Sequence, residues 1–214
     1  MEPAETATPA ASPGLWNVPN QLTVSRLVLS IVCFVFLALD WYLTGLVLFV
    51  IAAGTDWVDG YWARKYGQVT KLGRVMDPFA DKIIICGAFI FLAAVPRAGD
   101  SLLPASGIAP WMAVVVVARE MLVTALRSFF EEGGTDFSAK WAGKWKMLFQ
   151  CFAVIVSLAR LWLYFDPSYP VPMWKETPPA LLTYSLHALV WTAIAFTIYS
   201  GWEYVRAALR MLRK

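Results

Sequence analysis

Four aspartates lie within one short stretch, DWVDGYWARKYGQVTKLGRVMDPFAD, which runs from Asp56 to Asp81. If the stretch forms two helices joined by a short glycine-containing turn, Asp56 and Asp59 share one face of the first helix, while Asp77 and Asp81 share one face of the second. Two such faces turned toward each other bring four carboxylates together. Each carboxylate costs roughly 3 kcal/mol near a bilayer, so the cluster requires a compensating cation. Oxygen ligands without histidine or cysteine predict Mg²⁺ or Mn²⁺.

The rest of the chain is strongly apolar. Hydrophobic residues make up 59% and charged residues 15% of its 214 residues, and its mean hydropathy is +0.57. These values predict an all-α integral membrane protein. Six apolar segments are each long enough to cross about 30 Å of hydrocarbon. They are residues 22–39, residues 43 into the aspartate stretch, and residues 73–96, 111–130, 145–165 and 180–204.

Basic residues gather where the predicted segments end on one side of the membrane. By the positive-inside rule this side is cytoplasmic, which places both termini and the aspartates there. We therefore expect a polar active-site cavity that opens to the cytoplasm. Residues 1–14 are rich in Pro, Ala and Thr and are expected to form a disordered tail, followed by one membrane domain over residues 15–214. The proline-rich segment 166–179 is expected to be an external loop without regular structure.

A second polar group lies in the fourth apolar segment. Glu120 and Arg127 fall on one stripe of the expected helix, and Arg119 lies about 100° away from it. Ionisable residues inside an apolar helix suggest function, although an internal Arg–Glu pair that only joins helices is an alternative. Lys144 and Lys146 flank the expected start of the next helix, where they either bind an anion or simply follow the positive-inside rule.

The spacing D-x2-D-G-x2-A-R-x8-G-x3-D-x3-D resembles the signature of the CDP-alcohol phosphotransferase family and is matched at every fixed position. The later R-E-x6-R and G-K-x-K elements resemble the phosphatidylglycerophosphate synthase branch, although Met147 stands where that branch is expected to have threonine. The resemblance covers nearly the whole chain after residue 15. It implies transfer of a phosphatidyl group from CDP-diacylglycerol to glycerol 3-phosphate, giving phosphatidylglycerol phosphate and CMP. It also implies a homodimer in the bacterial cytoplasmic (inner) membrane.

The resemblance assigns roles to individual residues. Two metal ions are expected on Asp56, Asp59, Asp77 and Asp81, with Asp81 also accepting the proton of the acceptor hydroxyl. The expected contacts to CDP-diacylglycerol are Asn20, Thr23, Gly60, Ala63, Arg64, Thr70 and Gly73, although Asn20 and Thr23 are equally consistent with plain helix caps. The expected contacts to the acceptor phosphate are Arg119, Arg127, Lys144 and Lys146.

Other functions fit parts of the same pattern. A different acceptor alcohol, such as phosphatidylglycerol in cardiolipin synthesis or inositol phosphate, uses the same fold and chemistry. A divalent-cation transporter also uses clustered aspartates, but it places them near the bilayer centre rather than at the ends of spans. An inactive membrane scaffold does not explain the intact motif. Membrane lipids are expected partners, and nucleic acid is not.

Overall fold

The computed structural model of the 214-residue chain describes the backbone of residues 18–66, 71–98, 102–132, 141–167 and 173–212. Side chains are described over the same ranges except at residues 18–20, 22, 56–66, 71–78, 131–132, 142 and 212. The predicted tail over residues 1–14 and the candidate nucleotide contact Thr70 therefore lie outside the described residues.

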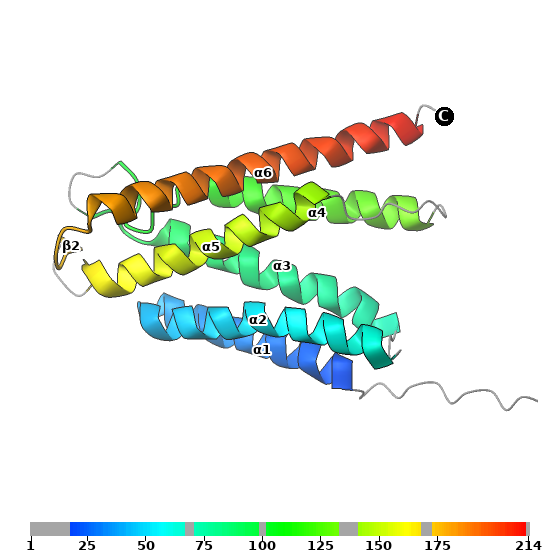
Figure 1. Ribbon diagram of the computed structural model, residues 1–214, viewed down its shortest axis with the longest axis horizontal. Helices are drawn as coiled ribbons and strands as arrows, with labels where there is room; N and C mark the ends of the chain where they lie inside the picture. Colours follow the sequence, from blue (N-terminus) through cyan, green and yellow to red (C-terminus); the bar gives the residue numbers. More distant parts are fainter. Residues whose placement is uncertain (1–17, 67–70, 99–101, 133–140, 168–172, 213–214) are drawn as a thin grey trace, which may run out of the picture.

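The described chain is a bundle of helices that run back and forth along one long axis (Figure 1). This confirms the prediction of an all-helical fold. Both the beginning of the first helix and the end of the last lie at the same end of the bundle. The helices are α1 (Val18–Ala38), α2 (Tyr42–Tyr66), α3 (Lys71–Ala94), α4 (Pro110–Glu132), α5 (Trp141–Tyr164) and α6 (Ala180–Leu212).

A short antiparallel ladder closes the opposite end of the bundle. It joins strand β1 (Phe165–Asp166) to strand β2 (Met173–Trp174), and Phe165 is paired with Trp174. The rings of these two residues lie 5.7 Å apart in an edge-on arrangement. The ladder corrects the expectation that segment 166–179 has no regular structure. Its four residues all carry the backbone amide that proline lacks, and the two rings pack together.

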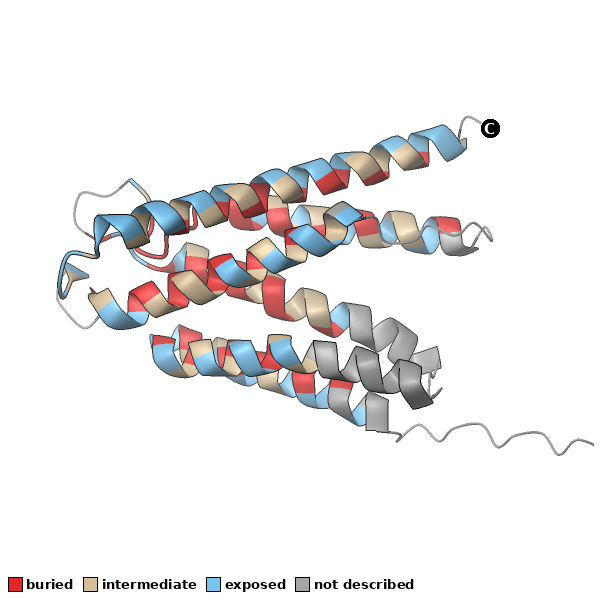
Figure 2. Ribbon diagram, in the orientation of Figure 1, coloured by how far each residue is buried: buried red, intermediate tan, exposed pale blue. Residues whose placement is uncertain are grey.

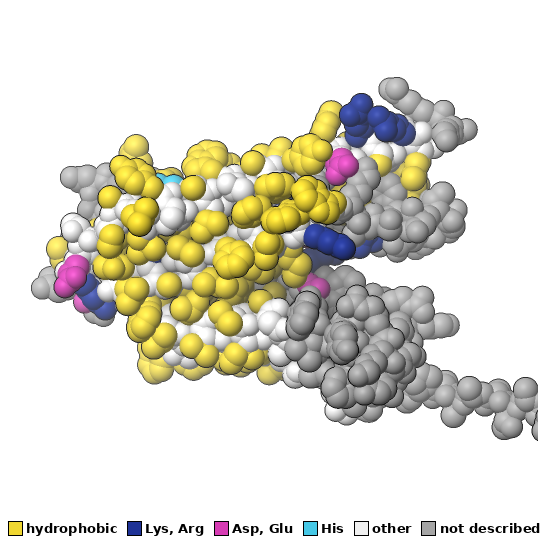
Figure 3. Space-filling model, in the orientation of Figure 1, with side chains coloured by type: hydrophobic (Ala, Val, Ile, Leu, Met, Phe, Trp, Pro, Cys, Tyr) yellow, Lys and Arg dark blue, Asp and Glu magenta, His cyan; other side chains and the backbone are white. Residues whose placement is uncertain are grey.

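Two of the described helices are long and apolar enough to cross a membrane, namely Gly143–Tyr164 within α5 and Ala180–Met211 within α6. Shorter apolar stretches cover Thr23–Ala38 and Tyr42–Thr55. On the face shown in Figure 3, hydrophobic side chains cover the middle of the bundle, and the described charged side chains lie toward its two ends. This distribution is typical of a membrane protein.

The interior of the bundle is divided into an apolar part and a polar part. Phe49, Phe89 and Leu158 are among the largest fully buried side chains of the main hydrophobic cluster. A smaller cluster, which includes Val123 and Tyr204, joins α4 to α6. Buried residues line the inward faces of the helices, as Figure 2 shows. Among the described residues, the buried charged side chains of Arg26, Glu120 and Lys146 belong to the site described below, whereas the buried Arg160 lies 4.6 Å from the centre of the Trp174 ring.

Close packing of α3 on α1 depends on the absence of a side chain at Gly87. A Cβ added there would lie 2.1 Å from the Cζ of Phe34, which is far inside van der Waals contact. The Phe34 ring is stacked on Phe91, with 5.4 Å between ring centroids and 17° between planes, so it has little room to move. Small residues commonly allow helices to approach in this way in membrane proteins.

We predict that Gly87→Ala lowers the stability of the bundle by about 1–3 kcal/mol, because the new methyl group overpacks the α1–α3 contact. Gly54→Ala is the matched control, since nothing lies within 4 Å of a Cβ added at that position. Alanine is preferred over glycine in helices by up to about 1 kcal/mol, so the control is expected to keep or gain stability. Thermal unfolding of both variants in detergent measures the difference. Equal unfolding temperatures would contradict the packing argument.

Candidate active site

The aspartate stretch spans the end of α2 and the first half of α3, which confirms the predicted pair of helices. Asp56 and Asp59 lie in α2 and Asp77 and Asp81 lie in α3, and the two helices are in contact. The four-residue repeat from Gly73 to Asp81 therefore follows one face of a continuous helix. Of the four aspartates, only Asp81 has a described side chain. Within the described residues no group of three or more potential metal ligands gathers, so the four-carboxylate cluster stays a prediction.

Asp81 is held by an arginine from another helix. Nη1 of Arg26 in α1 donates a hydrogen bond to Oδ1 of Asp81 across 2.8 Å. The Arg26 side chain is 2% exposed and that of Asp81 is 27% exposed, so the pair lies at the border between the interior and an open cavity. Thr23, a predicted nucleotide contact, is buried nearly one turn before Arg26. Arg26 was not among the predicted site residues, although an arginine within an apolar helix is itself a signal of function.

A cavity of ≈ 180 Å³ opens beside Asp81. Three helices supply its walls, and the charged side chains on them are two carboxylates and three cations. The lining residues are Asp81, Lys82 and Ile85 of α3, Glu120 and Arg127 of α4, and Lys146, Met147 and Gln150 of α5. The structure therefore brings together three of the predicted site residues, Asp81, Arg127 and Lys146. It also adds Lys82, for which no site role was predicted.

Glu120 joins two cations at the back of this cavity. Its Oε1 accepts hydrogen bonds from Nζ of Lys146 and from Nη1 of Arg119, the latter across 3.2 Å. The side chains of all three residues are at most 9% exposed. Removing one member of such a buried set leaves an uncompensated charge, which typically costs several kcal/mol. The internal Arg–Glu pair considered as an alternative for Glu120 is therefore present, and Lys146 belongs to it.

Hydroxyl groups orient the remaining cations. Nζ of Lys82 donates to Oγ1 of Thr124, and Nη2 of Arg127 donates to the Tyr204 hydroxyl across 3.3 Å. A hydroxyl fixes the direction of a cation without cancelling its charge. Both cations line the cavity, and these hydrogen bonds help to orient them.

Two of the predicted phosphate contacts lie elsewhere. Arg119 faces α6, where its Nε donates to Oγ of Ser200 across 3.1 Å and its guanidinium lies 5.6 Å from the centre of the Tyr204 ring. Lys144 is exposed and does not line the cavity. Residues two positions apart on a helix are separated by about 200°, so Lys144 points away from the side that carries Lys146. Both lysines lie inside α5, which begins at Trp141, rather than flanking its start.

The remaining predicted nucleotide contacts have positions but no described side chains. Gly60, Ala63 and Arg64 lie on α2 with the first two aspartates, and Gly73 lies on α3. Asn20 is part of α1. These α2 residues thus lie on one continuous helix, as expected. Their contacts to the nucleotide stay predictions.

Comparison with known families decides the class of this arrangement. Residues 16–205 match the family of CDP-alcohol phosphatidyltransferases. The chain belongs to that family. The match covers the whole bundle from α1 to most of α6, including every lining residue of the cavity.

Individual members of the family resemble the chain over nearly its full length. A protein of Bacillus subtilis (strain 168) is 34% identical over 206 residues, covering 89% of this chain and 94% of its own. A protein of Escherichia coli (strain K12) is 31% identical, covering 90% and 95%. A protein of Cereibacter sphaeroides is 29% identical, covering 92% and 98%. Each is named CDP-diacylglycerol–glycerol-3-phosphate 3-phosphatidyltransferase.

The Arg26–Asp81 pair leads to a prediction about turnover. Arg26→Met keeps much of the length of the side chain but removes the charge that orients Asp81. We expect kcat to fall at least about tenfold, and Asp81→Asn to lower it by ~10² to 10⁴. If Arg26 acts through Asp81, the double variant is no slower than Asp81→Asn alone, because the two losses are not independent.

The control for this cycle is Arg206→Met, which removes an exposed arginine from α6 near the same end of the bundle. Steady-state kinetics of the four variants, with thermal unfolding to verify folding, measures the coupling. A wild-type kcat in Arg26→Met, or fully additive losses in the double variant, would show that Arg26 does not position Asp81.

Proposed function

We propose that the protein transfers the phosphatidyl group of CDP-diacylglycerol to sn-glycerol 3-phosphate, giving phosphatidylglycerol phosphate and CMP. The observation that carries this proposal is the cavity in which Lys82, Arg127 and Lys146 gather beside Asp81. Cations around a carboxylate suit an acceptor that brings both a phosphate and a hydroxyl. The names of the relatives specify the same donor and acceptor.

In the proposed reaction, Asp81 accepts the proton of the attacking hydroxyl. The hydroxyl oxygen forms a bond to the phosphorus that carries the diacylglycerol group, and the bond from that phosphorus to the CMP oxygen breaks in line with it. Arg26 directs the Asp81 carboxylate toward the cavity, since its guanidinium donates to one carboxylate oxygen.

The residues also fit a metal requirement. Asp56 and Asp59 lie on α2 and Asp77 lies on α3 with Asp81, and an all-carboxylate set is the type that Mg²⁺ and Mn²⁺ prefer. We propose that these four aspartates hold two such ions. When bound, the ions neutralise the negative charge of the diphosphate and of the departing CMP.

The donor is proposed to lie along α2 and the first turns of α1. Gly60 and Ala63 leave the α2 backbone accessible to the nucleotide, and Arg64 is proposed to contact the diphosphate. Thr70 and Gly73 are proposed as further contacts, with Asn20 and Thr23 on the α1 side. Thr23 is buried close to Arg26, and Arg26 is hydrogen-bonded to Asp81. This proximity supports the placement of the donor.

The acceptor is proposed to place its phosphate between Lys82 and Arg127. Lys146 shares its charge with Glu120, so it contributes less to an incoming dianion than an unshared cation does. Lys82 has a hydroxyl partner, which leaves its charge uncompensated by that contact. Arg119 and Lys144 are assigned no direct contact in this arrangement, because neither lines the cavity.

We propose that all six helices cross the bacterial cytoplasmic membrane, with both termini and the cavity on the cytoplasmic side. The common end shared by the start of α1 and the end of α6 supports this topology (Figure 1). Three of the cavity residues, Arg127 of α4 and Lys146 and Met147 of α5, lie toward that end as well. A homodimer is proposed from the resemblance to the family.

The choice of acceptor is tested by offering purified protein CDP-diacylglycerol together with glycerol 3-phosphate, phosphatidylglycerol or inositol phosphate. We expect CMP release with glycerol 3-phosphate, accompanied by phosphatidylglycerol phosphate in the lipid extract. The three cations that line the cavity favour an acceptor that carries a free phosphate. Faster CMP release with either of the other two acceptors would contradict the proposed function.

Removal of divalent cations is expected to abolish turnover, because four neighbouring carboxylates then repel one another and the diphosphate. Adding back Mg²⁺ or Mn²⁺ is expected to restore it. The measurement is CMP release after dialysis against a chelator and after readdition of each ion. Full activity in excess chelator would rule out the metal site.

A further inference from the structure

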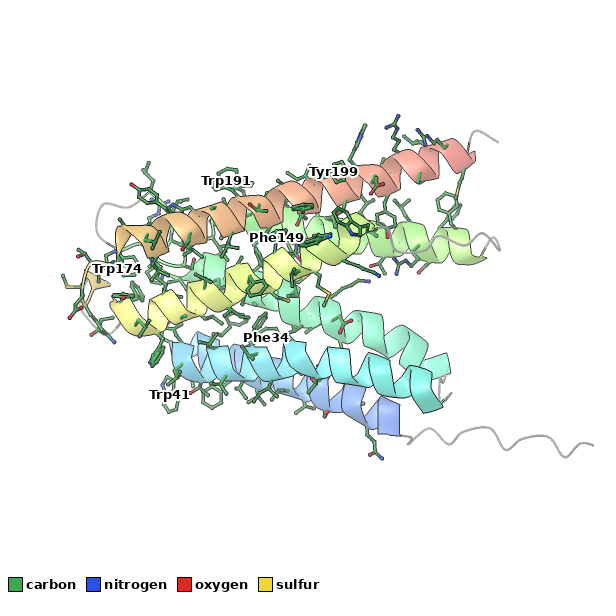
Figure 4. The ribbon with its side chains drawn as sticks, in the orientation of Figure 1. Phe34, Trp41, Phe149, Trp174, Trp191 and Tyr199 are labelled. Atoms are coloured by element: carbon green, nitrogen blue, oxygen red, sulfur yellow. The ribbon has the colours of Figure 1, made fainter. Side chains whose placement is uncertain are left out.

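A second cavity lies at the end of the bundle opposite to Asp81. It measures ≈ 260 Å³ and is formed by the turn between α1 and α2 and by the end of α5 with the segment that follows. Asp40, Trp41, Trp162, Phe165 and Lys175 are among its lining residues. Figure 4 labels Trp41 and Trp174, which both lie at this end of the bundle.

The two cavities lie toward opposite ends of α5. Between Lys146, which lines the first, and Trp162, which lines the second, α5 advances 16 residues, or about 24 Å. The hydrocarbon core of a bilayer is about 30 Å thick. If the first cavity lies at one membrane surface, as the proposed function requires, the second lies at the other.

Asp40 occupies a backbone position that normally favours glycine. Its φ is 59°, and the turn follows the hydrogen-bond pattern of a Schellman helix end, in which Trp41 N donates to Phe36 O across 2.9 Å. The rings of Phe36 and Trp41 are in contact, with centroids 5.5 Å apart. The left-handed conformation carries a steric cost for a residue with a Cβ, and aspartate tolerates it better than most. The chain therefore places a carboxylate where the turn itself needs none.

The charged groups of the cavity are held apart rather than paired. The Tyr42 hydroxyl donates to Oδ1 of Asp40 across 2.6 Å, which fixes the carboxylate. The backbone N of Lys175 donates to Tyr164 O across 2.8 Å, which fixes the base of the lysine. Among the described residues, no ion pair joins Asp40 to Lys175.

We propose that this cavity binds the headgroup of a zwitterionic phospholipid from the leaflet opposite to the active site. Asp40 and the Trp41 ring receive the ammonium, and Lys175 receives the phosphate. One negative and one positive group in the same cavity match the two charges of such a headgroup.

The surface beside the cavity suits the rest of the lipid. Leu43 and Val47 on α2 and Trp162 on α5 are 42–48% exposed and form apolar surface next to the charged groups. Acyl chains can therefore extend along the helices while the headgroup occupies the cavity. An anionic headgroup without an ammonium meets the Asp40 carboxylate without compensation, so the cavity favours the zwitterion.

The test uses the purified full chain in detergent and native mass spectrometry with equal amounts of phosphatidylethanolamine and phosphatidylglycerol. The wild type is expected to retain phosphatidylethanolamine preferentially. Asp40→Asn is expected to lower that retention about fivefold and shift the preference toward phosphatidylglycerol, because only the cation remains. Lys175→Gln is expected to lower the retention of both lipids about fivefold.

Controls separate the cavity from general surface charge. Arg97→Gln and Glu176→Gln remove exposed charges near the same end that do not line the cavity, and both are expected to behave as wild type. Asp40→Gly separates the turn from the headgroup: its unfolding temperature is expected to stay or rise, since glycine suits the φ, while phosphatidylethanolamine retention falls. CMP release by the same variants reports on the proposed function independently.

Equal retention of the two lipids by the wild type would overturn the proposal, as would unchanged retention in both Asp40→Asn and Lys175→Gln. An equal loss in Arg97→Gln or Glu176→Gln would also overturn it. Glycerophosphoethanolamine distinguishes a lipid from a soluble headgroup. Failure to displace the lipid at equal concentration supports a lipid site, and complete displacement would assign the cavity to a soluble phosphodiester instead.

Discussion

Charge compensation inside an apolar bundle is the constraint on which the rest of this structure depends. An ionised side chain removed from water needs a partner, and the partners here come from different helices. Arg26 of α1 pairs with Asp81 of α3, and Lys146 of α5 pairs with Glu120 of α4. Each pair therefore serves as a cross-link in the bundle as well as a part of the site.

The central helix of this arrangement is α3. Asp81 is hydrogen-bonded to Arg26 on α1, and its neighbour Lys82 is hydrogen-bonded to Thr124 on α4. Two adjacent residues thus connect α3 to two different helices. Farther along the same helix, Gly87 admits the Phe34 ring and sets the closeness of α3 to α1. Apolar packing of α3 around Gly87 fixes the position of the part of the helix that carries Asp81 and Lys82. The positions of Asp81 and Lys82 thus depend on contacts that carry no charge.

Much of the fold was predictable from the sequence, because long apolar segments and the aspartate spacing are local patterns. The helical periodicity correctly placed Asp56 and Asp59 on one helix and Asp77 and Asp81 on another. Periodicity describes one helix at a time, however, and it does not reveal which faces of separate helices meet. For this reason the sequence analysis missed Arg26 and Lys82 as parts of the site.

The same reasoning explains the two phosphate contacts that the cavity does not include. Lys144 and Lys146 are close in sequence but lie on different sides of α5, and Arg119 lies next to Glu120 but turns to α6. Closeness in sequence therefore does not place these residues in the same site. The short ladder and the second cavity depend on contacts between distant segments, such as Phe165 with Trp174, which no local pattern contains.

The central claim is that cavity cations recognise the phosphate of the acceptor. Its most direct measurement is the ratio of kcat/KM for glycerol 3-phosphate to kcat/KM for glycerol, in the wild type and in Lys82→Met and Arg127→Met. Loss of a charged hydrogen bond is worth ~1.5 to 3 kcal/mol, so the ratio is expected to fall roughly tenfold to a hundredfold in each variant, while the value for glycerol stays near wild type. Lys144→Met, which removes an exposed cation, provides the comparison. An unchanged ratio in both cavity variants would contradict the claim.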